Sequence, residues 1–490
     1  MKTGLFTLLV FPCALSFAVP SLIWFKAYDS GYNDYAQGIA IDSSWNVVVT
    51  GTSYNGIDFD CFTIKYNPLG DTIWTRRFDT GTSDIARSVA IDVSGNIIVV
   101  GSSRVDSIYD YLIIKYDSNG NLIWVRRYQT QFNNFGMGVA IDINQNIIVT
   151  GYSFNGNSYD YLTIKFSQTG DTIWSRRLDY GYNDLAQDIA VDGDNNIIVT
   201  GFSFRDSIFA YLTVKYDSLG NTLWVRHFLS PYYDNKAYGV TADFDNNIIV
   251  IGMTPAFPYI VKYNPMGDTL WTYYYNGNWW GGWFTEPRDI TVDSLNNILF
   301  VSSFTQLTYE SDYATIKCTP DGDTVWHLFF RESLYDTLDA YARGIAISPM
   351  GDIVVTGYEH NHTDYDYVTV KYSESGVIEE TPQVQAAIDN FITVFPNPFT
   401  NYCVIHYALS TMHYAENGVA SSQKSVVSMK IYNSTGQLVK QFNHLTIQPF
   451  NQIIWDGDES SGQRLPPGVY FVCLRCGGFS AIKKVVKLGG

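Results

Sequence analysis

Short apolar runs separated by Gly, Asn and Asp fill most of the chain, and they follow the two-residue period of strands rather than the period of helices. In one copy the predicted strands are residues 188–192, 196–201, 211–216 and 221–226. The polar links between them are short enough for tight hairpin turns. The pattern therefore predicts an all-β protein built from small antiparallel units.

This unit occurs seven times, with a period near 50 residues. Each copy carries a tryptophan after Ile, Leu or Val, at Trp24, Trp74, Trp124, Trp174, Trp224, Trp271 and Trp326. A lysine that ends an apolar run recurs in step, at Lys65, Lys115, Lys165, Lys215, Lys262, Lys317 and Lys371. Four antiparallel strands per repeat of this length are typical of a propeller blade. Side chains present in most copies build the repeat, so chemistry is expected where the copies differ.

The order of the strands predicts how the repeats close into a ring. The mature chain enters on a strand of the tryptophan type, residues 22–28, and no such strand follows Lys371. The seventh copy therefore has three strands of its own, and the first strand of the chain can supply the fourth and remove an exposed edge. We expect a seven-bladed β-propeller over residues 19–374, closed by its N-terminal strand.

The repeat resembles the bacterial β-propeller repeats of the SBBP type. Their units read roughly AIAVD-x-x-GN-(I/V)-x-VTG, a loop, DYxTIKY and, after a turn, LW. Residues 89–124 follow this pattern nearly throughout. The resemblance implies the propeller fold and says little about activity, because propellers serve many unrelated functions.

A different all-β pattern follows a linker at residues 375–390. Residues 391–490 contain about seven short predicted strands, which indicates a small immunoglobulin-like β-sandwich. Its motifs are a Phe-Pro-Asn-Pro-Phe opening with Asn397 and Pro398, a turn ending at Gly436, a Gly468-Val-Tyr470 strand and a lysine-rich end.

These motifs resemble the C-terminal sorting domain of type IX secretion substrates, which is similar to the immunoglobulin-like domain of flagellar hook-capping proteins. The resemblance implies the type IX secretion machinery as a partner. It also makes Asn397, Pro398, Gly436, Gly468 and Tyr470 the residues of the sorting motif. The alternative is an adhesive sandwich that merely terminates the protein.

The first residues read as an export signal. Lys2 is followed by an apolar stretch at residues 5–17, and Ser16 and Ala18 place small residues before a cleavage site after Ala18. This stretch is too short for a membrane span, and no later segment has about 18 uninterrupted apolar residues. We expect residues 1–18 to be a signal peptide and the mature protein to be secreted or displayed on the outer surface of a bacterium.

Charge and cysteines narrow the function further. The net charge is −17, with 31 Lys and Arg against 48 Asp and Glu, which disfavours nucleic acid and anionic membrane surfaces as partners. Five cysteines remain after cleavage, an odd and scattered set that does not form a disulfide framework. Cys473 and Cys476 lie on a predicted strand, where packing explains them better than redox or zinc chemistry.

No catalytic residue, metal site or cofactor is predicted. None of the seven histidines is part of a recognisable set of nucleophile, base and orienting residue. The recurring aspartates, such as Asp42 and Asp142, start hairpins, where a carboxylate accepts turn N–H groups. The paired arginines on the tryptophan strands are expected to make solvated ion pairs with neighbouring blades. The sequence from His360 through His362 to Asp364 could hold a metal, but solvated loop histidines are the simpler interpretation.

The candidate ligand-binding residues lie on long loops at one face of the propeller. Trp279, Trp280 and Trp283 fall outside the repeating tryptophan position and could form an aromatic platform. The alternative is a loop that caps the channel or a neighbouring blade. Other loops of this face carry Tyr32, Tyr182 and Tyr232, and loops rich in Tyr, Asn and Gly are typical of recognition surfaces.

We therefore expect a non-enzymatic propeller that binds a glycan or protein partner through its long-loop face. One alternative is a polysaccharide-processing enzyme with carboxylates gathered around the channel. Another is a purely structural component of the cell surface.

Overall fold

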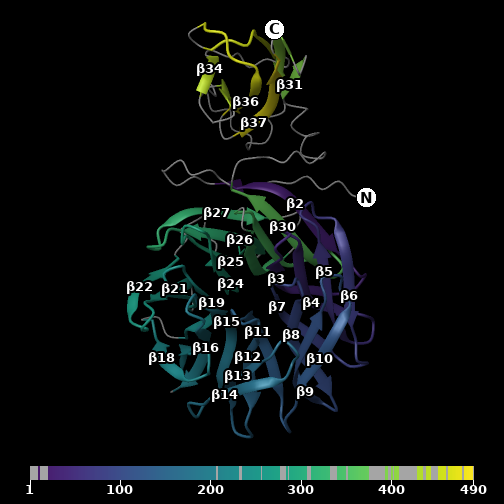
Figure 1. The fold of residues 1–490 in the computed structure, drawn as a ribbon, viewed down its shortest axis with the longest axis vertical. Helices are drawn as coiled ribbons and strands as arrows, with labels where there is room; N and C mark the ends of the chain where they lie inside the picture. Colours follow the sequence, from purple (N-terminus) through teal and green to yellow (C-terminus); the bar gives the residue numbers. More distant parts are fainter. Residues whose placement is uncertain are drawn as a thin grey trace. The chain divides into compact units, whose positions relative to one another are not determined.

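A computed structural model of the chain describes residues 9–10, 20–205, 208–230, 234–254, 257–275, 283–284, 286–305, 311–330, 339–348, 351–374, 392–395, 399–400, 402–407, 427–433, 438–442, 451–459, 462–476 and 479–488. The chain divides into two compact units, Met1–Val377 and Ile378–Gly490. Regular structure in the described residues is entirely β (Figure 1). None of these residues belongs to a helix that could cross a membrane.

The first unit consists of antiparallel sheets with the form of propeller blades (Figure 1). Sheet 1 comprises β3 (Asp34–Ile41), β4 (Val47–Tyr54), β5 (Phe59–Tyr66) and β6 (Thr72–Phe78). Sheet 2 comprises β7 (Asp84–Ile91), β8 (Ile97–Val105), β9 (Ile108–Tyr116) and β10 (Leu122–Tyr128). Sheet 3 comprises β11 (Asn134–Ile141), β12 (Ile147–Phe154), β13 (Tyr159–Phe166) and β14 (Thr172–Leu178). Sheet 4 comprises β15 (Asp184–Val191), β16 (Ile197–Arg205), β17 (Ile208–Tyr216) and β18 (Thr222–Phe228).

The remaining sheets of this unit contain the less regular copies of the repeat. Sheet 5 comprises β19 (Lys236–Ala242), β20 (Ile248–Met253), β21 (Pro258–Tyr263) and β22 (Thr269–Tyr274). Sheet 6 comprises β24 (Asp289–Val292), β25 (Ile298–Thr305), β26 (Ser311–Cys318) and β27 (Thr324–Phe330), with β23 (Trp283–Phe284) beside β25 and β1 (Leu9–Val10) beside β27. Sheet 7 comprises β28 (Ala340–Ile347), β29 (Ile353–His360), β30 (Tyr365–Ser373) and β2 (Ser21–Tyr28).

The repeating lysine and tryptophan join each sheet to the next one. In sheet 1, Lys65 Nζ lies 2.8 Å from Asp42 Oδ2, and both side chains are buried. Lys65 and Trp74 also donate to the same carbonyl oxygen, that of Ser118 in sheet 2, at 3.2 Å each. A buried ammonium needs hydrogen-bonding partners, so the regular spacing of lysine and tryptophan in the repeat reflects the packing of neighbouring sheets.

The two ends of the first unit meet through the same contacts. β2 pairs antiparallel with β30, with Trp24 opposite Lys371. Trp24 donates to the carbonyl of Pro68 in sheet 1 at 3.0 Å, and the Tyr367 hydroxyl donates to the carbonyl of Phe62 at 3.2 Å. β2 thus bonds to sheet 7, and both contact sheet 1.

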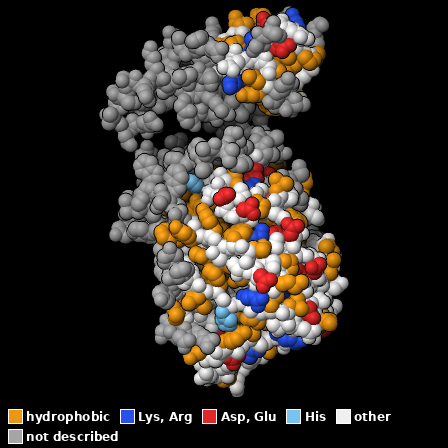
Figure 2. Space-filling view, turned by 90° about the vertical axis from the view of Figure 1, so that its left-hand side faces the viewer, with side chains coloured by type: hydrophobic (Ala, Val, Ile, Leu, Met, Phe, Trp, Pro, Cys, Tyr) orange, Lys and Arg blue, Asp and Glu red, His pale blue; other side chains and the backbone are white. Residues whose placement is uncertain are grey.

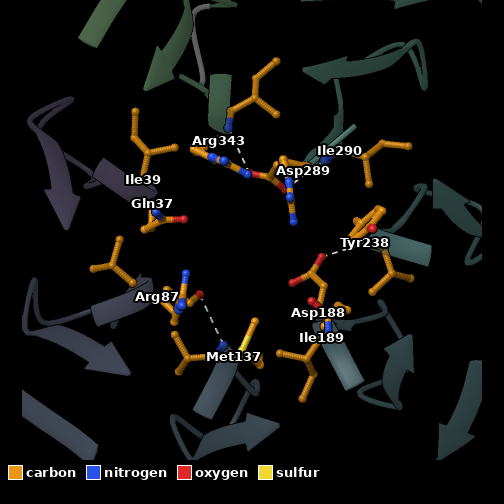
Figure 3. A pocket seen from close by; sticks show the side chains of 18 of the residues that line it. Gln37, Ile39, Arg87, Met137, Asp188, Ile189, Tyr238, Asp289, Ile290 and Arg343 are labelled. Carbon is orange, nitrogen blue, oxygen red and sulfur yellow. Dashed lines mark hydrogen bonds between the residues drawn. The ribbon is translucent and has the colours of Figure 1, made fainter. Parts of the chain in front are cut away.

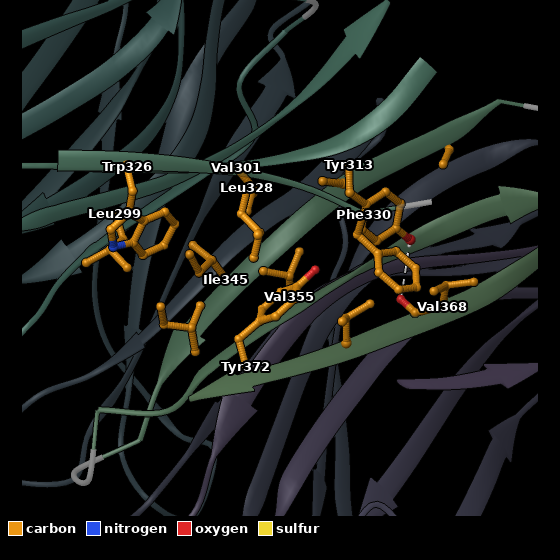
Figure 4. Packing of buried hydrophobic residues seen from close by; sticks show 14 of the residues in the cluster. Leu299, Val301, Tyr313, Trp326, Leu328, Phe330, Ile345, Val355, Val368 and Tyr372 are labelled. Carbon is orange, nitrogen blue, oxygen red and sulfur yellow. Dashed lines mark hydrogen bonds between the residues drawn. The ribbon is translucent and has the colours of Figure 1, made fainter. Parts of the chain in front are cut away.

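Apolar side chains fill the space between adjacent sheets. Figure 4 shows Leu299 and Leu328 of sheet 6 packed with Ile345 and Val355 of sheet 7. Burying each such side chain contributes about 1.5–3 kcal/mol to stability. On the side of the unit that carries β18 and β22, apolar side chains lie scattered among polar and charged ones (Figure 2).

The paired arginines differ from the expectation of solvated ion pairs between blades. Arg126 donates to the backbone carbonyls of Thr169 and Gly170 in the next sheet and lies over the Trp124 ring. Arg177 pairs with Asp160 of its own sheet at 2.6 Å, and Asp160 is fully buried. The first arginine of a pair therefore joins sheets through carbonyl groups, and the second neutralises a buried acid.

The second unit has two sheets that share one core. One sheet comprises β31 (Ile392–Phe395), β32 (Cys403–Tyr407) and β35 (Asn451–Trp455). The other comprises β34 (Leu438–Phe442), β33 (Val427–Asn433), β36 (Gly468–Cys476) and β37 (Phe479–Lys487). Ile405 and Trp455 of the first sheet pack with Ile431 and Val472 of the second. Cys473 and Cys476 both lie on β36, as predicted.

Candidate binding pocket

A pocket of about 640 Å³ lies among the innermost strands of the first unit (Figure 3). It is lined by side chains from β3, β7, β11, β15, β19, β24 and β28, and by Arg288, the residue just before β24. In β11 the pairing register shifts between Gly136 and Gly138, and corresponding shifts occur in β3, β7, β15, β19 and β28. Such a bulge re-aims the extra residue, here Met137, into the pocket.

The bulge position, or the corresponding position just before β24, carries Gln, Arg, Met or Tyr. Its occupants are Gln37, Arg87, Met137, Gln187, Tyr238, Arg288 and Arg343, and all of them line the pocket. Three of the seven are arginines in a protein with a net charge of −17. The pocket therefore combines cations and polar groups that the packing of the repeat does not require.

On three inner strands the next residue, Ser88, Asp188 or Asp289, accepts a backbone N–H from a neighbouring sheet. Asp188 Oδ2 accepts the N–H of Val240 at 2.8 Å, and Asp289 Oδ2 accepts the N–H of Ile345 at 2.9 Å (Figure 3). Burial raises the pKa of Asp188 to about 6. Burial and then the charge of Asp188 raise the pKa of Asp289 to about 8. The structure thus brings two interacting carboxyl groups from different sheets into one pocket.

Two of the arginines retain unused hydrogen-bonding capacity. Arg288 forms an ion pair with Glu286 and lies 4.7 Å from the centre of the Tyr238 ring. Arg343 bonds to the Tyr358 hydroxyl and lies 5.0 Å from the centre of that ring. The Nε atoms of Arg288 and Arg343 are buried, and neither has a hydrogen-bond partner among the described residues. A buried guanidinium N–H without a partner favours a bound acceptor, above all an anionic one.

The charges of the pocket do not cancel fully. Burial lowers the pKa of Arg288, and the nearby charge of Arg343 lowers it further. Burial is also the first cause of the lowered pKa of Arg87, with the charge of Arg343 contributing in the same direction. The positive charges of these guanidinium groups therefore repel one another, and the carboxyl groups nearby tend to stay protonated. A bound anion would relieve this repulsion.

Aromatic rings surround the end of the pocket at which the inner strands begin. Tyr35 contacts Tyr358 with ring centres 4.9 Å apart and Tyr365 with ring centres 5.5 Å apart. In sheet 3, Phe135 takes the position that Tyr35 has in sheet 1. It lies opposite Tyr152, with ring centres 5.2 Å apart. These inner strands start directly after the long loops, so the rings lie near the predicted long-loop face.

The arrangement suits a polar ligand that carries an acidic group. Flat aromatic rings pack against sugar rings and exclude water, while arginines bind carboxylate or sulfate oxygens. Gln37 and Gln187 also line the pocket and add amide donors and acceptors.

The predicted ligand-binding residues do not line this pocket where their placement is described. Tyr32 and Tyr182 are 48% and 45% exposed, on loops before β3 and β15. Trp283 lies in β23, where it pairs with Thr305 of β25. Trp279, Trp280 and Tyr232 lie outside the described residues.

The recurring aspartates have the predicted turn role and a further one. Asp142 Oδ1 accepts the N–H of Asn146 at 2.8 Å, and Asp142 Oδ2 lies 2.7 Å from Lys165 Nζ. The two histidines near Asp364 do not gather around a common centre. His360 Nδ1 accepts the N–H of His362, and the His360 ring packs against Tyr365.

The sorting motif is described in part. Gly468 begins β36. Tyr470 is buried in the same strand, donates its hydroxyl to the carbonyl of Pro466 at 2.7 Å and packs against Trp455. Asn397, Pro398 and Gly436 lie outside the described residues. The described part of the motif thus contributes to the core of the second unit.

Comparisons with known proteins concern the fold of the whole chain and the identity of its C-terminal part. The chain is similar to PorZ, an essential bacterial surface component of the type IX secretion system of Porphyromonas gingivalis, at 13% identity and a TM-score of 0.45. The match covers 92% of this chain and 59% of PorZ, so this chain spans less than two thirds of that protein. No curated protein matches the chain in sequence.

The chain is also similar to two other solved structures. Sqt1 from Chaetomium thermophilum matches at 10% identity and a TM-score of 0.44, over 96% of this chain and all of Sqt1 (100%). The gluconolactonase XC5397 from Xanthomonas campestris matches at 11% identity and a TM-score of 0.36, over 65% of this chain and 99% of that protein. Similarity at this level carries no inference about activity.

The C-terminal part has a clearer assignment. Residues 393–488 match the family model of the secretion system C-terminal sorting domain, which agrees with the motifs that begin at Phe395. Such a domain directs its protein through type IX secretion. The second unit therefore belongs to the type IX C-terminal sorting domains, and the chain is a secreted or cell-surface protein.

Proposed function

We propose that the first unit is a seven-bladed propeller of the SBBP type, closed by β2, which binds an acid-bearing glycan outside the cell without catalysis. On this proposal, residues 1–18 are a signal peptide that is cleaved during export, and the sorting domain delivers the propeller to the cell surface or medium. The ligand enters the central pocket from the long-loop face.

The observation that carries this proposal is the pair of buried Nε atoms of Arg288 and Arg343, which lack partners among the described residues. They lie in a pocket that also contains Tyr238 and Tyr358. An acidic sugar supplies both groups that these residues favour, a ring face for the aromatic side chains and an anion for the guanidinium groups. A protein ligand would present the same chemistry through an acidic side chain.

The experiment is a glycan array probed with the full chain and with a variant carrying Arg288→Met and Arg343→Met. Methionine keeps much of the apolar stem and removes the charge. We expect binding to glycans with uronic acid or sulfate groups, and loss of that binding in the variant. Tyr32→Ala with Tyr182→Ala is the matched control, because both tyrosines are exposed on the long-loop face outside the pocket.

The remaining predicted residues define a second location for the same function. A variant with Trp279, Trp280 and Trp283 changed to alanine tests the loop platform directly. If this variant loses binding and the arginine variant keeps it, the ligand binds on the loop and not in the pocket. Absence of any glycan binding by the folded parent would favour a protein partner or a structural role.

One observation favours the enzymatic alternative. Asp188 and Asp289 share a pocket and have raised pKa values, about 6 and about 8, and two interacting carboxyl groups can divide acid and base roles. Each also accepts a backbone N–H from the next sheet, which gives it a structural function. Incubation of the full chain with bound acidic glycans tests this alternative. Cleavage that Asp188→Asn abolishes would establish it, and intact glycans would support pure binding.

A further inference from the structure

Three carboxylates meet at the outer end of the contact between β2 and β30. Oxygen atoms of Asp29, Asp364 and Asp366 all lie within 4.8 Å of one another. Asp29 directly follows β2, and the other two residues lie in or just before β30. Asn361 donates to Asp364 and to Asp366 at 2.8 Å each. The amide therefore holds the two carboxylates in place without neutralising them.

The corresponding clusters in sheets 1 and 3 contain an arginine. Asp60 pairs with Arg77 at 2.7 Å, and Asp160 pairs with Arg177 at 2.6 Å. Arg77 lies opposite Phe62 in the strand register, and Arg177 lies opposite Leu162. Phe62 and Leu162, the residues opposite the arginines, each stand two positions after the buried aspartate of their sheet.

In sheet 7 the same register position is an alanine. Ala27 lies opposite Val368, which stands two residues after Asp366. Sheet 7 therefore keeps the buried aspartate of the repeat and lacks the guanidinium that neutralises it in sheets 1 and 3. The missing cation is a property of the sequence of β2, which supplies the outer strand of this sheet.

Two further positions in sheet 7 are more acidic than in sheet 3. Ser158 donates its hydroxyl to Asp160 Oδ1 at 3.2 Å, and Asp364 takes the place of Ser158. Ser153 lies opposite Asp160 in the register, and Glu359 lies opposite Asp366. Compared with sheet 3, sheet 7 thus has carboxyl groups in place of two hydroxyl groups; sheet 1 also has an aspartate, Asp58, at the position of Asp364, but keeps its arginine.

Asp366 itself shows an unmet interaction. Its side chain is 8% exposed, and its Oδ1 atom has no hydrogen-bond partner among the described residues. The corresponding oxygen of Asp160 is bonded to Ser158, and that of Asp60 also lacks a partner among the described residues, but both of those acids are paired with an arginine. Burial, and then the charges of Asp29 and Asp364 among others, raise the pKa of Asp366 to about 7. An unpartnered oxygen on a buried acid that faces two other carboxylates is the arrangement a cation would complete.

We propose that Asp29, Asp364 and Asp366 bind a calcium ion, which takes the place that an arginine occupies in sheets 1 and 3. Hard oxygen ligands select calcium or magnesium over softer metals. Carboxylate oxygens within 4.8 Å of one another can share one calcium ion at Ca–O distances of about 2.3–2.6 Å, and calcium tolerates irregular ligand geometry better than magnesium does. The ion would link β2 to the loop before β30, so calcium outside the cell would stabilise the junction of the two ends of the first unit.

Calcium binding by the full, EDTA-treated chain tests the proposal, measured by equilibrium dialysis against calcium chloride alone. We expect a dissociation constant in the range of extracellular calcium sites, about 10⁻⁴–10⁻³ M. Ala27→Arg restores the repeat's own cation, and Asp364→Ser restores the hydroxyl of sheet 3. Each variant is expected to lose the site, and Ala27→Arg should also raise the melting temperature measured without calcium.

The matched control is Asp179→Asn, which alters the arginine-containing cluster Asp160, Asp179 and Asp184 of sheet 3. This variant is expected to bind calcium as the parent does. Absence of binding up to about 10 mM calcium, well above the range for extracellular sites, would overturn the proposal. Binding that persists unchanged in both Ala27→Arg and Asp364→Ser would overturn it as well.

Discussion

Lys165 Nζ lies 2.7 Å from Asp142 Oδ2, and both side chains are almost completely buried. The same ammonium donates to the carbonyl of Ser218 in the next sheet at 2.9 Å. Burial alone would raise the pKa of Asp142, but hydrogen bonds from Lys165 and Asn146 lower it below its ordinary value. This pair recurs around the first unit and explains why the lysine and the aspartate repeat together.

Removing the acid of this pair should destabilise the first unit strongly. Asp142→Asn leaves the Lys165 ammonium buried without its counter-ion, and breaking such a pair costs about 3–5 kcal/mol. We expect a lower urea midpoint for unfolding of the first unit. Asp117→Asn is the control, because Asp117 makes the same turn contacts to Asn119 and Asn121 in an exposed hairpin. Similar losses in the two variants would show that turn contacts, and not the buried ion pair, determine the effect.

The N-terminal strand should be required for a closed, monomeric first unit. Deleting residues 21–28 removes β2 and exposes the hydrogen-bonding edge of β30, and exposed edges pair with other chains. We expect the deletion to lower the melting temperature and to cause self-association, which light scattering after size exclusion would detect. A monomeric deletion variant with an unchanged melting temperature would contradict closure by β2.

Asp289 should make stability depend on pH. Its pKa is raised from 3.8 to about 8, first by burial and then by the charge of Asp188, so the folded state holds this proton more tightly. This contribution is complete below about pH 4 and is lost as the pH rises through about 8. Asp289→Asn retains an oxygen for the Ile345 N–H and removes the titration. We expect the variant to lose less stability than the parent between about pH 5 and pH 8.

Urea unfolding of parent and variant at both pH values measures this difference. Equal losses in the two proteins would show that Asp289 does not titrate with a raised pKa. Asp171→Asn, on the exposed turn before β14, provides a control for removing one acidic group from the first unit.

The sequence predicted the middle strands of each repeat better than the inner ones. In the fourth copy, residues 211–216 were expected as a strand, and β17 runs Ile208–Tyr216. The inner strand was expected at residues 188–192, but β15 runs Asp184–Val191. The bulge between Ala186 and Asp188 breaks the alternation of apolar and polar residues, so the first half of the strand has the pattern of a loop.

The same bulge explains why the candidate site could not be predicted from the sequence. The principle that chemistry lies where the copies differ applies to Gln37, Arg87 and Arg343, yet the differences that sequence analysis weighed were those of the long loops. Without knowledge of the register shift, the sequence does not indicate that the side chain at the bulge position points into a central pocket. The cluster of Asp29, Asp364 and Asp366 could not be predicted either. Asp29 and Asp366 are 337 positions apart in the sequence (366 − 29) and come together only through the pairing of β2 with β30.

The central claim is that the pocket around Arg288 and Arg343 binds an acid-bearing glycan. The most direct measurement is a calorimetric titration of the full chain with the tightest acidic oligosaccharide from the array, repeated with Arg343→Met and with Tyr32→Ala. A hydrogen bond to a charged group contributes about 1.5–3 kcal/mol, so we predict at least roughly tenfold weaker binding for Arg343→Met. Tyr32→Ala should bind as the parent does. Unchanged affinity in Arg343→Met, or a loss confined to Tyr32→Ala, would contradict the account.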